Sequence, residues 1–122
     1  MRVYIVTAAL LLVAAVSLGA NEPLSMAVSP AQSLAPTNLT IRIHVEPDAG
    51  NRALEVIAES GAFYRSSRIQ IDGAEAPRTI SFEFRNVPGG DYEVRGILIN
   101  SAGKERAGVR RHVIVIEPAD RE

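Results

Sequence analysis

From residue 39 to residue 117 the apolar residues recur at every second position, which is the period of strands that bury one face. The segment 41–45 alternates isoleucine and valine with arginine and histidine, and the segment 79–85 alternates isoleucine and phenylalanine with polar residues. We expect the following residues to face a common core: Ile41, Ile43, Val45, Leu54, Val56, Ile69, Ile71, Ile80, Phe82, Phe84, Val87, Val94, Leu98, Val113 and Val115.

Turn sequences divide this pattern into short segments. Proline, glycine, aspartate and asparagine gather at residues 47–51, 72–73 and 88–91, and no helical period of useful length lies between them. The spacing predicts an all-β domain over residues 38–117, an antiparallel Greek-key β-sandwich of six or seven strands. Residues 118–122 are expected to be a short tail.

The first twenty residues have the pattern of a secretory signal peptide, with Arg2 ahead of an apolar run and small residues after it. We expect a signal over residues 1–20, with cleavage either after Gly19 or as late as Ala27, where Ser-Met-Ala is the better small-x-small match. An uncleaved membrane anchor is a second alternative, because a spanning helix needs about 20 apolar residues. The protein is therefore expected to be exported, either periplasmic or extracellular.

Residues 21–37 contain three prolines among many alanines and serines. Each proline removes a backbone donor, so we expect a flexible, disordered spacer between signal and domain. The alternative is that Met26 and Val28 form an edge strand.

The sequence Pro88-Gly89-Gly90-Asp91-Tyr92 predicts a structural turn. Pro88 presets one corner, and we expect positive φ angles at the two glycines. Tyr92 then enters the next strand with its ring in the core and its hydroxyl bonded to a nearby backbone group, the arrangement called a tyrosine corner.

Residues 82–104 resemble the last strands of an immunoglobulin-like domain of the fibronectin type III kind, in which a Pro-Gly turn, a corner tyrosine and an Asn-x-x-Gly loop occur together. The absence of tryptophan departs from that family. The stretch Phe-x-Phe-x-Asn-Val-Pro-Gly-Gly-x-Tyr is also similar to carboxypeptidase-regulatory, transthyretin-like domains. Both resemblances imply a non-catalytic binding, spacer or accessory role with no cofactor.

Composition narrows the chemistry further. The chain has no cysteine, which excludes disulfides, thiolate metal sites and cysteine nucleophiles. Its net charge of −1 argues against a nucleic-acid partner, which would require a basic face.

The titratable residues do not form a recognisable catalytic or metal motif. Only two histidines are present, His44 and His112, whereas a zinc site needs three or four ligands. Asp48, Asp72 and Asp91 lie in or beside turns, where an aspartate bonds its own backbone. No Gly-x-Ser-x-Gly elbow occurs. We expect neither an enzyme nor a metal site, with a metal bridging the two histidines as the alternative.

One strand face is expected to bind a partner. If Tyr92 faces inward, Ile97 and Ile99 face outward, and an exposed apolar patch marks an interaction surface. The alternatives are that the spacer or the chain end from Pro118 covers the patch, or that a bulge turns the isoleucines inward. The predicted partner-binding residues are Tyr64, Arg68, Ile97, Ile99, His112 and Ile114.

These observations predict an exported, non-catalytic module for binding or protein–protein interaction in the cell envelope or outside the cell. Its partner would be another envelope protein or a surface polymer, with membrane contact only through an uncleaved N-terminal segment. The alternatives are a carbohydrate- or surface-polymer-binding accessory module and a small metal-binding protein.

Overall fold

The computed structural model describes residues 22–119 of the chain. The predicted signal peptide at 1–20 and the last three residues of the tail lie outside this range, and no helix within it is long and apolar enough to cross a membrane. The elements are β1 (Leu24–Ser29), β2 (Gln32–Leu34), β3 (Thr37–Val45), β4 (Asn51–Glu59), β5 (Tyr64–Gln70), a 3-10 turn η1 (Gly73–Glu75), β6 (Thr79–Val87), β7 (Gly90–Asn100) and β8 (Glu105–Ile116).

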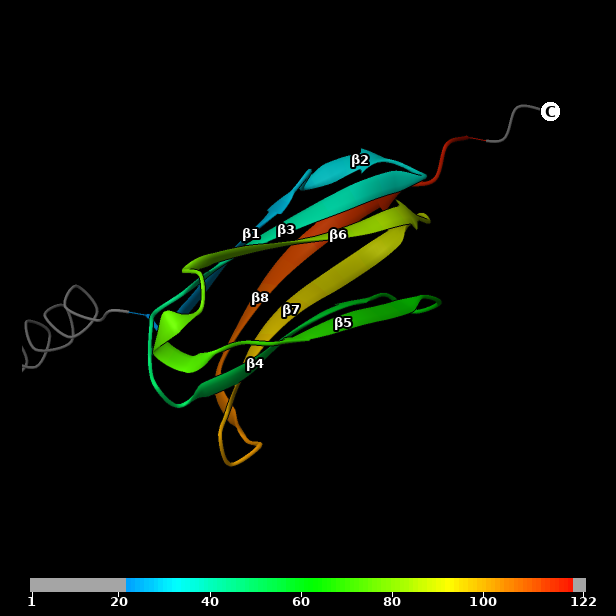
Figure 1. Ribbon diagram of the computed structural model, residues 1–122. Coiled ribbons are helices and arrows are strands. Elements are labelled where there is room, and N and C mark those ends of the chain that lie inside the picture. The colour runs from blue at the N-terminus through cyan, green and yellow to red at the C-terminus, as the bar shows by residue number, and fades with distance from the viewer. Residues whose placement is uncertain (1–21, 120–122) are drawn as a thin grey trace, which may run out of the picture.

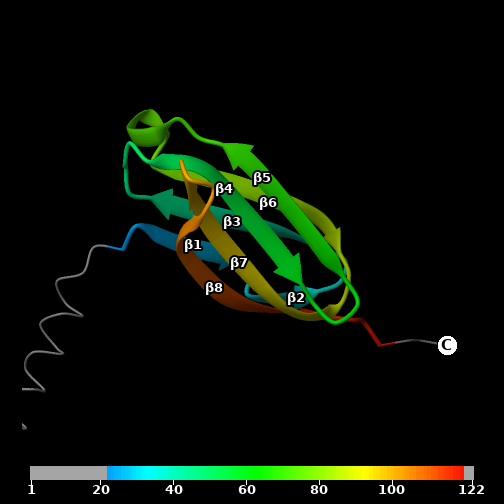
Figure 2. The ribbon, with the colours of Figure 1, turned by 90° about the horizontal axis from the view of Figure 1, so that it is seen from below.

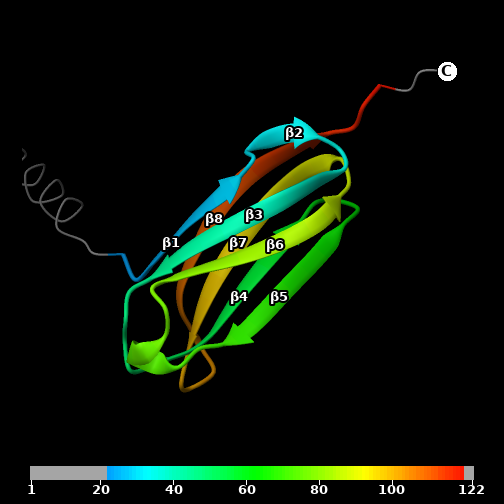
Figure 3. The ribbon, with the colours of Figure 1, turned by 45° about the horizontal axis from the view of Figure 1, so that its top comes forward.

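The strands form the two layers of a β-sandwich (Figure 1). One sheet has three strands in the order β1-β3-β6, and the other has five in the order β2-β8-β7-β4-β5. All neighbours pair antiparallel except β2, which runs parallel to β8. Figure 3 shows the three-stranded sheet lying across β7 and β8. The predicted fold class is confirmed.

The core lies between the sheets and is made by the alternating apolar residues. Every residue expected to face inward belongs to this core or packs against it. Leu39, Ile41 and Leu54 are completely buried. Two central strands, β7 and β4, therefore have one face dictated by the core, while their other face is free to form a site.

The expected spacer over residues 21–37 is wrong as a description of this segment. Residues 24–29 and 32–34 form β1 and β2, and Leu24 and Met26 are 4% and 5% exposed. The prolines stand between strands, where their missing N–H groups interrupt no ladder. The sandwich consequently has eight strands rather than six or seven, since the two additional strands come from this segment.

The alternative cleavage point after Ala27 falls inside β1. A cut there would separate Leu24 and Met26 from the strand that pairs with β3. An earlier cut would leave β1 whole.

The turn before β7 holds Tyr92 in the core. The Tyr92 hydroxyl donates a 2.8 Å hydrogen bond to the carbonyl oxygen of Pro88, which is the bond that the corner interpretation requires. The ring is fully buried and lies edge-on to Phe63 at 5.8 Å between centroids.

The expectation of positive φ at Gly89 and Gly90 is wrong. Neither glycine has a positive φ, whereas Asn86 has φ 56° within β6, where the register with β3 shifts. Gly89 is needed for a different reason: an added Cβ would stand 2.3 Å from the Glu117 carboxylate. The close approach of the chain end, rather than backbone strain, explains the glycine.

Candidate functional site

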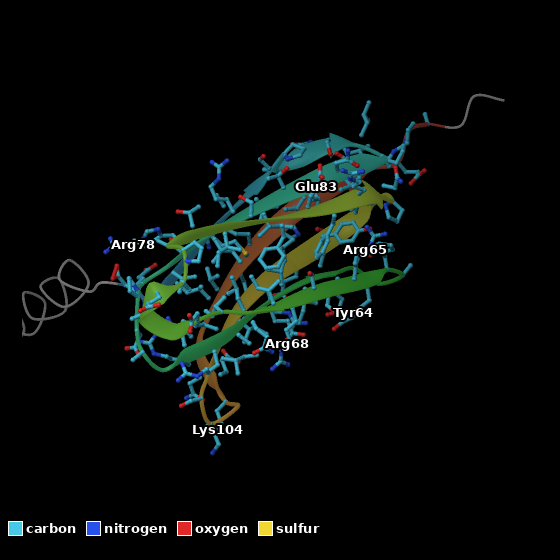
Figure 4. The ribbon with its side chains drawn as sticks, in the orientation of Figure 1. Tyr64, Arg65, Arg68, Arg78, Glu83 and Lys104 are labelled. Atoms are coloured by element: carbon cyan, nitrogen blue, oxygen red, sulfur yellow. The ribbon has the colours of Figure 1, made fainter. Side chains whose placement is uncertain are left out.

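The outer face of the five-stranded sheet is the candidate site. Strand pairing places all six predicted partner-binding residues on it, because each alternates with a core residue of the same strand. Figure 2 views the sandwich from the side of β4 and β5, and Figure 4 shows Tyr64 and Arg68 on the side of β5 that points away from β6.

These residues do not form the continuous apolar patch that was expected. Ile97 is half-buried and Ile99 is only 8% exposed. Ile99 pairs with Ala53 on one side and with Glu105 on the other, and it is outward-facing but covered. Tyr64, at the edge of the sheet, is 59% exposed.

A separate apolar cluster lies at the opposite edge of the same face. Leu34, Ile114 and Ile116 are 63%, 40% and 40% exposed, and Leu34 on β2 pairs with Ile116 on β8. Leu34 was missed because its segment had no strand period long enough to recognise.

Between these edges runs a band of paired charges. The Arg95 guanidinium donates through Nη2 to Glu59 at 3.1 Å, and its Nε lies 3.5 Å from Glu93. Arg110 donates to the second oxygen of Glu93 at 3.3 Å. Arg95 Nε is buried and makes no hydrogen bond of good geometry, so its charge is met by the Glu93 carboxylate beside it.

Beside this band the surface is hollowed into a depression of about 420 Å³, which we call the groove. Gly108, opposite Ile97, has no side chain to fill it. A Cβ there would stand 2.7 Å from Glu105 Oε2, because the Glu105 carboxylate reaches over the glycine. The groove is lined by Glu93, Arg95, Gly96, Ile97, Glu105, Gly108, Val109 and Arg110.

The two histidines lie on opposite faces of the sandwich and cannot share a metal. His44 is on the outer face of β3, in the three-stranded sheet, whereas His112 is on β8. His112 Nε2 contacts the Asp91 carboxylate on the adjacent strand. Among residues 22–119 no three histidine or acidic side chains are grouped to hold a metal ion.

The turn residue Asp48 is also accounted for by partners within the protein rather than by a metal ion. Asp48 accepts from the Gly50 amide at 2.7 Å, as a turn aspartate does. Its other oxygen accepts from Arg106 at 3.0 Å, and Arg106 also donates to buried Asn51 at 3.1 Å. The guanidinium supplies the positive charge at this end of the sandwich.

Comparison with known families gives no assignment from sequence. No family model matches the chain, and no curated protein matches it.

Solved structures share the fold at low identity. A superoxide reductase (neelaredoxin) from Ignicoccus hospitalis matches with a TM-score of 0.60 and 14% identity, covering 77% of this chain and 80% of that one. A variant of it matches with a TM-score of 0.62 and 15% identity, covering 83% of this chain and 86% of that one. At such identity the likeness establishes the fold alone.

A second kind of protein contains the same sandwich as one part. A family 76 glycoside hydrolase from a bovine Bacteroides thetaiotaomicron strain matches with a TM-score of 0.55 and 14% identity. The match covers 80% of this chain but 21% of the hydrolase. The fold is thus found both as a nearly whole small protein and as a fraction of a large one.

These findings correct the main functional expectation. The sequence predicted a non-catalytic interaction module, but the structures that share the fold are named as superoxide reductases and a glycoside hydrolase. The protein–protein interaction module is therefore not proposed again, and its two alternatives, a metal-binding protein and a carbohydrate-binding module, remain as candidates.

Proposed function

We propose that the protein is a carbohydrate- or surface-polymer-binding accessory module whose site is the groove on the outer face of β7 and β8. The observation that supports this most is the composition of the groove wall. Two guanidiniums, of Arg95 and Arg110, stand beside two carboxylates, of Glu93 and Glu105. The two guanidiniums donate hydrogen bonds, the two carboxylates accept them, and their charges cancel. Such a wall suits a neutral ligand rich in hydroxyl groups, because a hydroxyl both donates and accepts hydrogen bonds.

The size of the groove agrees with this ligand class. Small-molecule sites commonly have volumes of about 300–1,000 Å³, and this one has about 420 Å³. The sandwich also matches a fifth of a glycoside hydrolase, which is the proportion of an appended module.

Filling the groove tests the proposal. The probes are neutral gluco-, manno- and xylo-oligosaccharides titrated into the protein, with backbone amide shifts and calorimetry as readouts. Gly108→Val should abolish binding, because the valine side chain would occupy the groove. The φ angle of Gly108 is not in the left-handed region, so the backbone there can accept a valine. Ser81→Val, on the exposed outer face of β6, is the matched control and should bind as the parent does.

The ionic strength dependence separates a neutral ligand from an acidic one. We expect the affinity to change less than about twofold when salt is raised from about 0.05 to 0.5 M, because screening acts on net charge. A steep loss with salt would instead identify an anionic polymer and contradict the neutral assignment.

A metal-binding role is the second candidate, favoured by one contact. His112 Nε2 meets the Asp91 carboxylate on an exposed face, and histidine with carboxylate is a donor set that zinc accepts. Glu93, the cross-strand partner of His112, is the nearest further donor, although it bonds Arg110. Zinc titration of the parent, His112→Asn and the control His44→Asn decides it: binding lost only in His112→Asn supports the site, and binding in all three refutes it.

We also propose that the sandwich is immunoglobulin-like, of the fibronectin type III kind or the similar carboxypeptidase-regulatory kind. The separation of strands into three and five, and the Tyr92–Pro88 hydrogen bond, support this grouping. A sequence profile built from homologues that matched one of these families would decide between them.

We also propose that the protein is exported, and the position of β1 limits where a signal peptide could be cleaved. We expect the mature chain to begin before Leu24, because cleavage after Ala27 would remove part of the core. N-terminal sequencing of the protein recovered from outside the host cytoplasm tests this. A mature end at Val28 would contradict it.

A further inference from the structure

Strand register extends the groove into a longer track across the sheet. Four residues stand directly opposite one another on successive strands: His112 on β8, Glu93 on β7, Glu59 on β4 and Tyr64 on β5. Neighbouring strands are about 4.8 Å apart, so this row spans roughly 14 Å. All four side chains are on the outer face.

A second row lies beside the first and shares its hydrogen bonds. It consists of Arg110, Arg95, Ile57 and Ser66, in the same strand order. Arg95 is the link between the groove and the far strands, because its Nη2 bonds Glu59 on β4 while its Nε lies 3.5 Å from Glu93 on β7. The polar groups are therefore continuous from the groove to β4.

The track ends at an exposed aromatic ring. Tyr64 is 59% exposed at the edge strand, and Ser66 beside it is also exposed. An aromatic ring offers a flat apolar face with a polar tip, which suits the face of a sugar ring. Tyr64 lies two strands from β7, roughly 10 Å across the sheet from Glu93 at one end of the groove, and Gly108 lies farther away, so a ligand in the groove must be longer than one ring to reach Tyr64.

We infer that the site binds a linear oligosaccharide lying across β8, β7, β4 and β5, with one unit in the groove and a unit about two positions along it stacked on Tyr64. The inference rests on the proposed function, and it adds the ligand's length and direction. The ligand runs obliquely across the strands, because Ile97 in the groove, which pairs with Gly108, lies four residues along β7 from Glu93, whose row contains Tyr64.

A length series tests this inference. The probes are neutral β-1,4-linked gluco- and manno-oligosaccharides of one to six units, titrated into the purified protein. Affinity should rise up to three or four units and then level off. Tyr64→Ala should weaken binding of the tetrasaccharide by roughly threefold to tenfold, which is the value of one aromatic contact, and should leave the monosaccharide unchanged.

Two controls separate stacking from folding. Tyr64→Phe should retain the parent affinity, because the ring remains. Arg95→Ala should weaken every length, since Arg95 lines the groove itself.

The outcomes distinguish the two proposals. If the monosaccharide binds as tightly as the tetrasaccharide, or Tyr64→Ala has no effect, the track is refuted while the groove stands. If no oligosaccharide of the series binds, the proposed function fails and the track with it.

Discussion

At the scale of single residues, Tyr92 is the side chain that the fold constrains most. Its ring is buried between the sheets while its hydroxyl reaches the backbone of the turn that precedes it. A buried hydroxyl that lost its partner would cost free energy. The Tyr92 hydroxyl oxygen therefore links the turn at Pro88 to the core.

Replacing this tyrosine isolates that bond. We expect Tyr92→Phe to lower the free energy of unfolding by about 0.5–1.5 kcal/mol, because one hydrogen bond is lost while the ring stays. Urea unfolding measures the change. Tyr64→Phe, at an exposed position, is the control and should change stability by less than about 0.5 kcal/mol. Equal stabilities for parent and Tyr92→Phe would count against the corner.

The same hydroxyl gives a pH dependence. Burial, as the largest cause, raises the pKa of Tyr92 above its ordinary value of 10.0. The unfolded chain therefore loses this proton first, so the stabilisation is complete below about pH 10 and declines as pH rises through the higher folded value. Unfolding curves between about pH 9 and pH 11 should show a steeper loss for the parent than for Tyr92→Phe. Parallel curves would contradict the shift.

At the scale of elements, β1 decides whether the sandwich has a complete three-stranded sheet. It pairs along its whole length with β3 and packs against β8. Leu24 and Met26 point inward while Ser25 and Ala27 do not. Without it β3 would be an edge strand and the core would lose two large side chains.

Alternating substitutions along β1 test its place in the core. Met26→Ala should cost about 2–5 kcal/mol, because a buried methionine leaves a cavity. Ser25→Ala, one residue away and facing outward, should cost less than about 0.5 kcal/mol. A truncation that begins at residue 38 should fail to unfold cooperatively. If Met26→Ala proved as harmless as Ser25→Ala, the segment would be a spacer after all.

At the scale of the whole molecule, the two sheets meet closely on one side and stand apart on the other. β1 contacts β8, whereas β5 and β6 are both edge strands. Arg65 crosses the open side: its Nη1 donates to the Arg85 carbonyl oxygen at 2.6 Å, and its guanidinium lies over the Phe63 and Phe84 rings at 5.0 and 6.0 Å (Figure 4). One side chain thus joins the edges of both layers.

Removing the Arg65 side chain should destabilise the edge strands β5 and β6. We expect Arg65→Ala to lower the free energy of unfolding by about 1–3 kcal/mol, from one charged hydrogen bond and the contacts with the rings. Amides of β5 and β6 should exchange faster with solvent, and those of β7 should not. Arg68→Ala, on the outer face of the same strand, is the control. If the amides of β5 and β6 exchanged at the same rates in Arg65→Ala and Arg68→Ala, Arg65 would not link the two sheets.

Much of the candidate site could be placed from sequence, and part of it could not. Period-two alternation puts Tyr64, Ile97 and His112 on an outward face, because each follows and precedes an inward residue. It does not say which strands are neighbours. The pairing of Glu93 with His112 and with Glu59 joins residues from separate parts of the chain.

The sequence by itself determined the alternation, and with it the fold class, the core and the outward-facing residues, because burial of one strand face demands apolar residues at a period of two. Only the tertiary structure decided the rest. The segment 24–34 contains strands because it pairs with the edges of β3 and β8. Its prolines made these strands unrecognisable in the sequence pattern. Ile99, which pairs with Ala53 and Glu105, is nearly buried, and pairing of β7 with β8 sets Gly108 opposite Ile97 at the groove. Exposure on a sheet depends on all adjacent side chains, and those are set by long-range pairing.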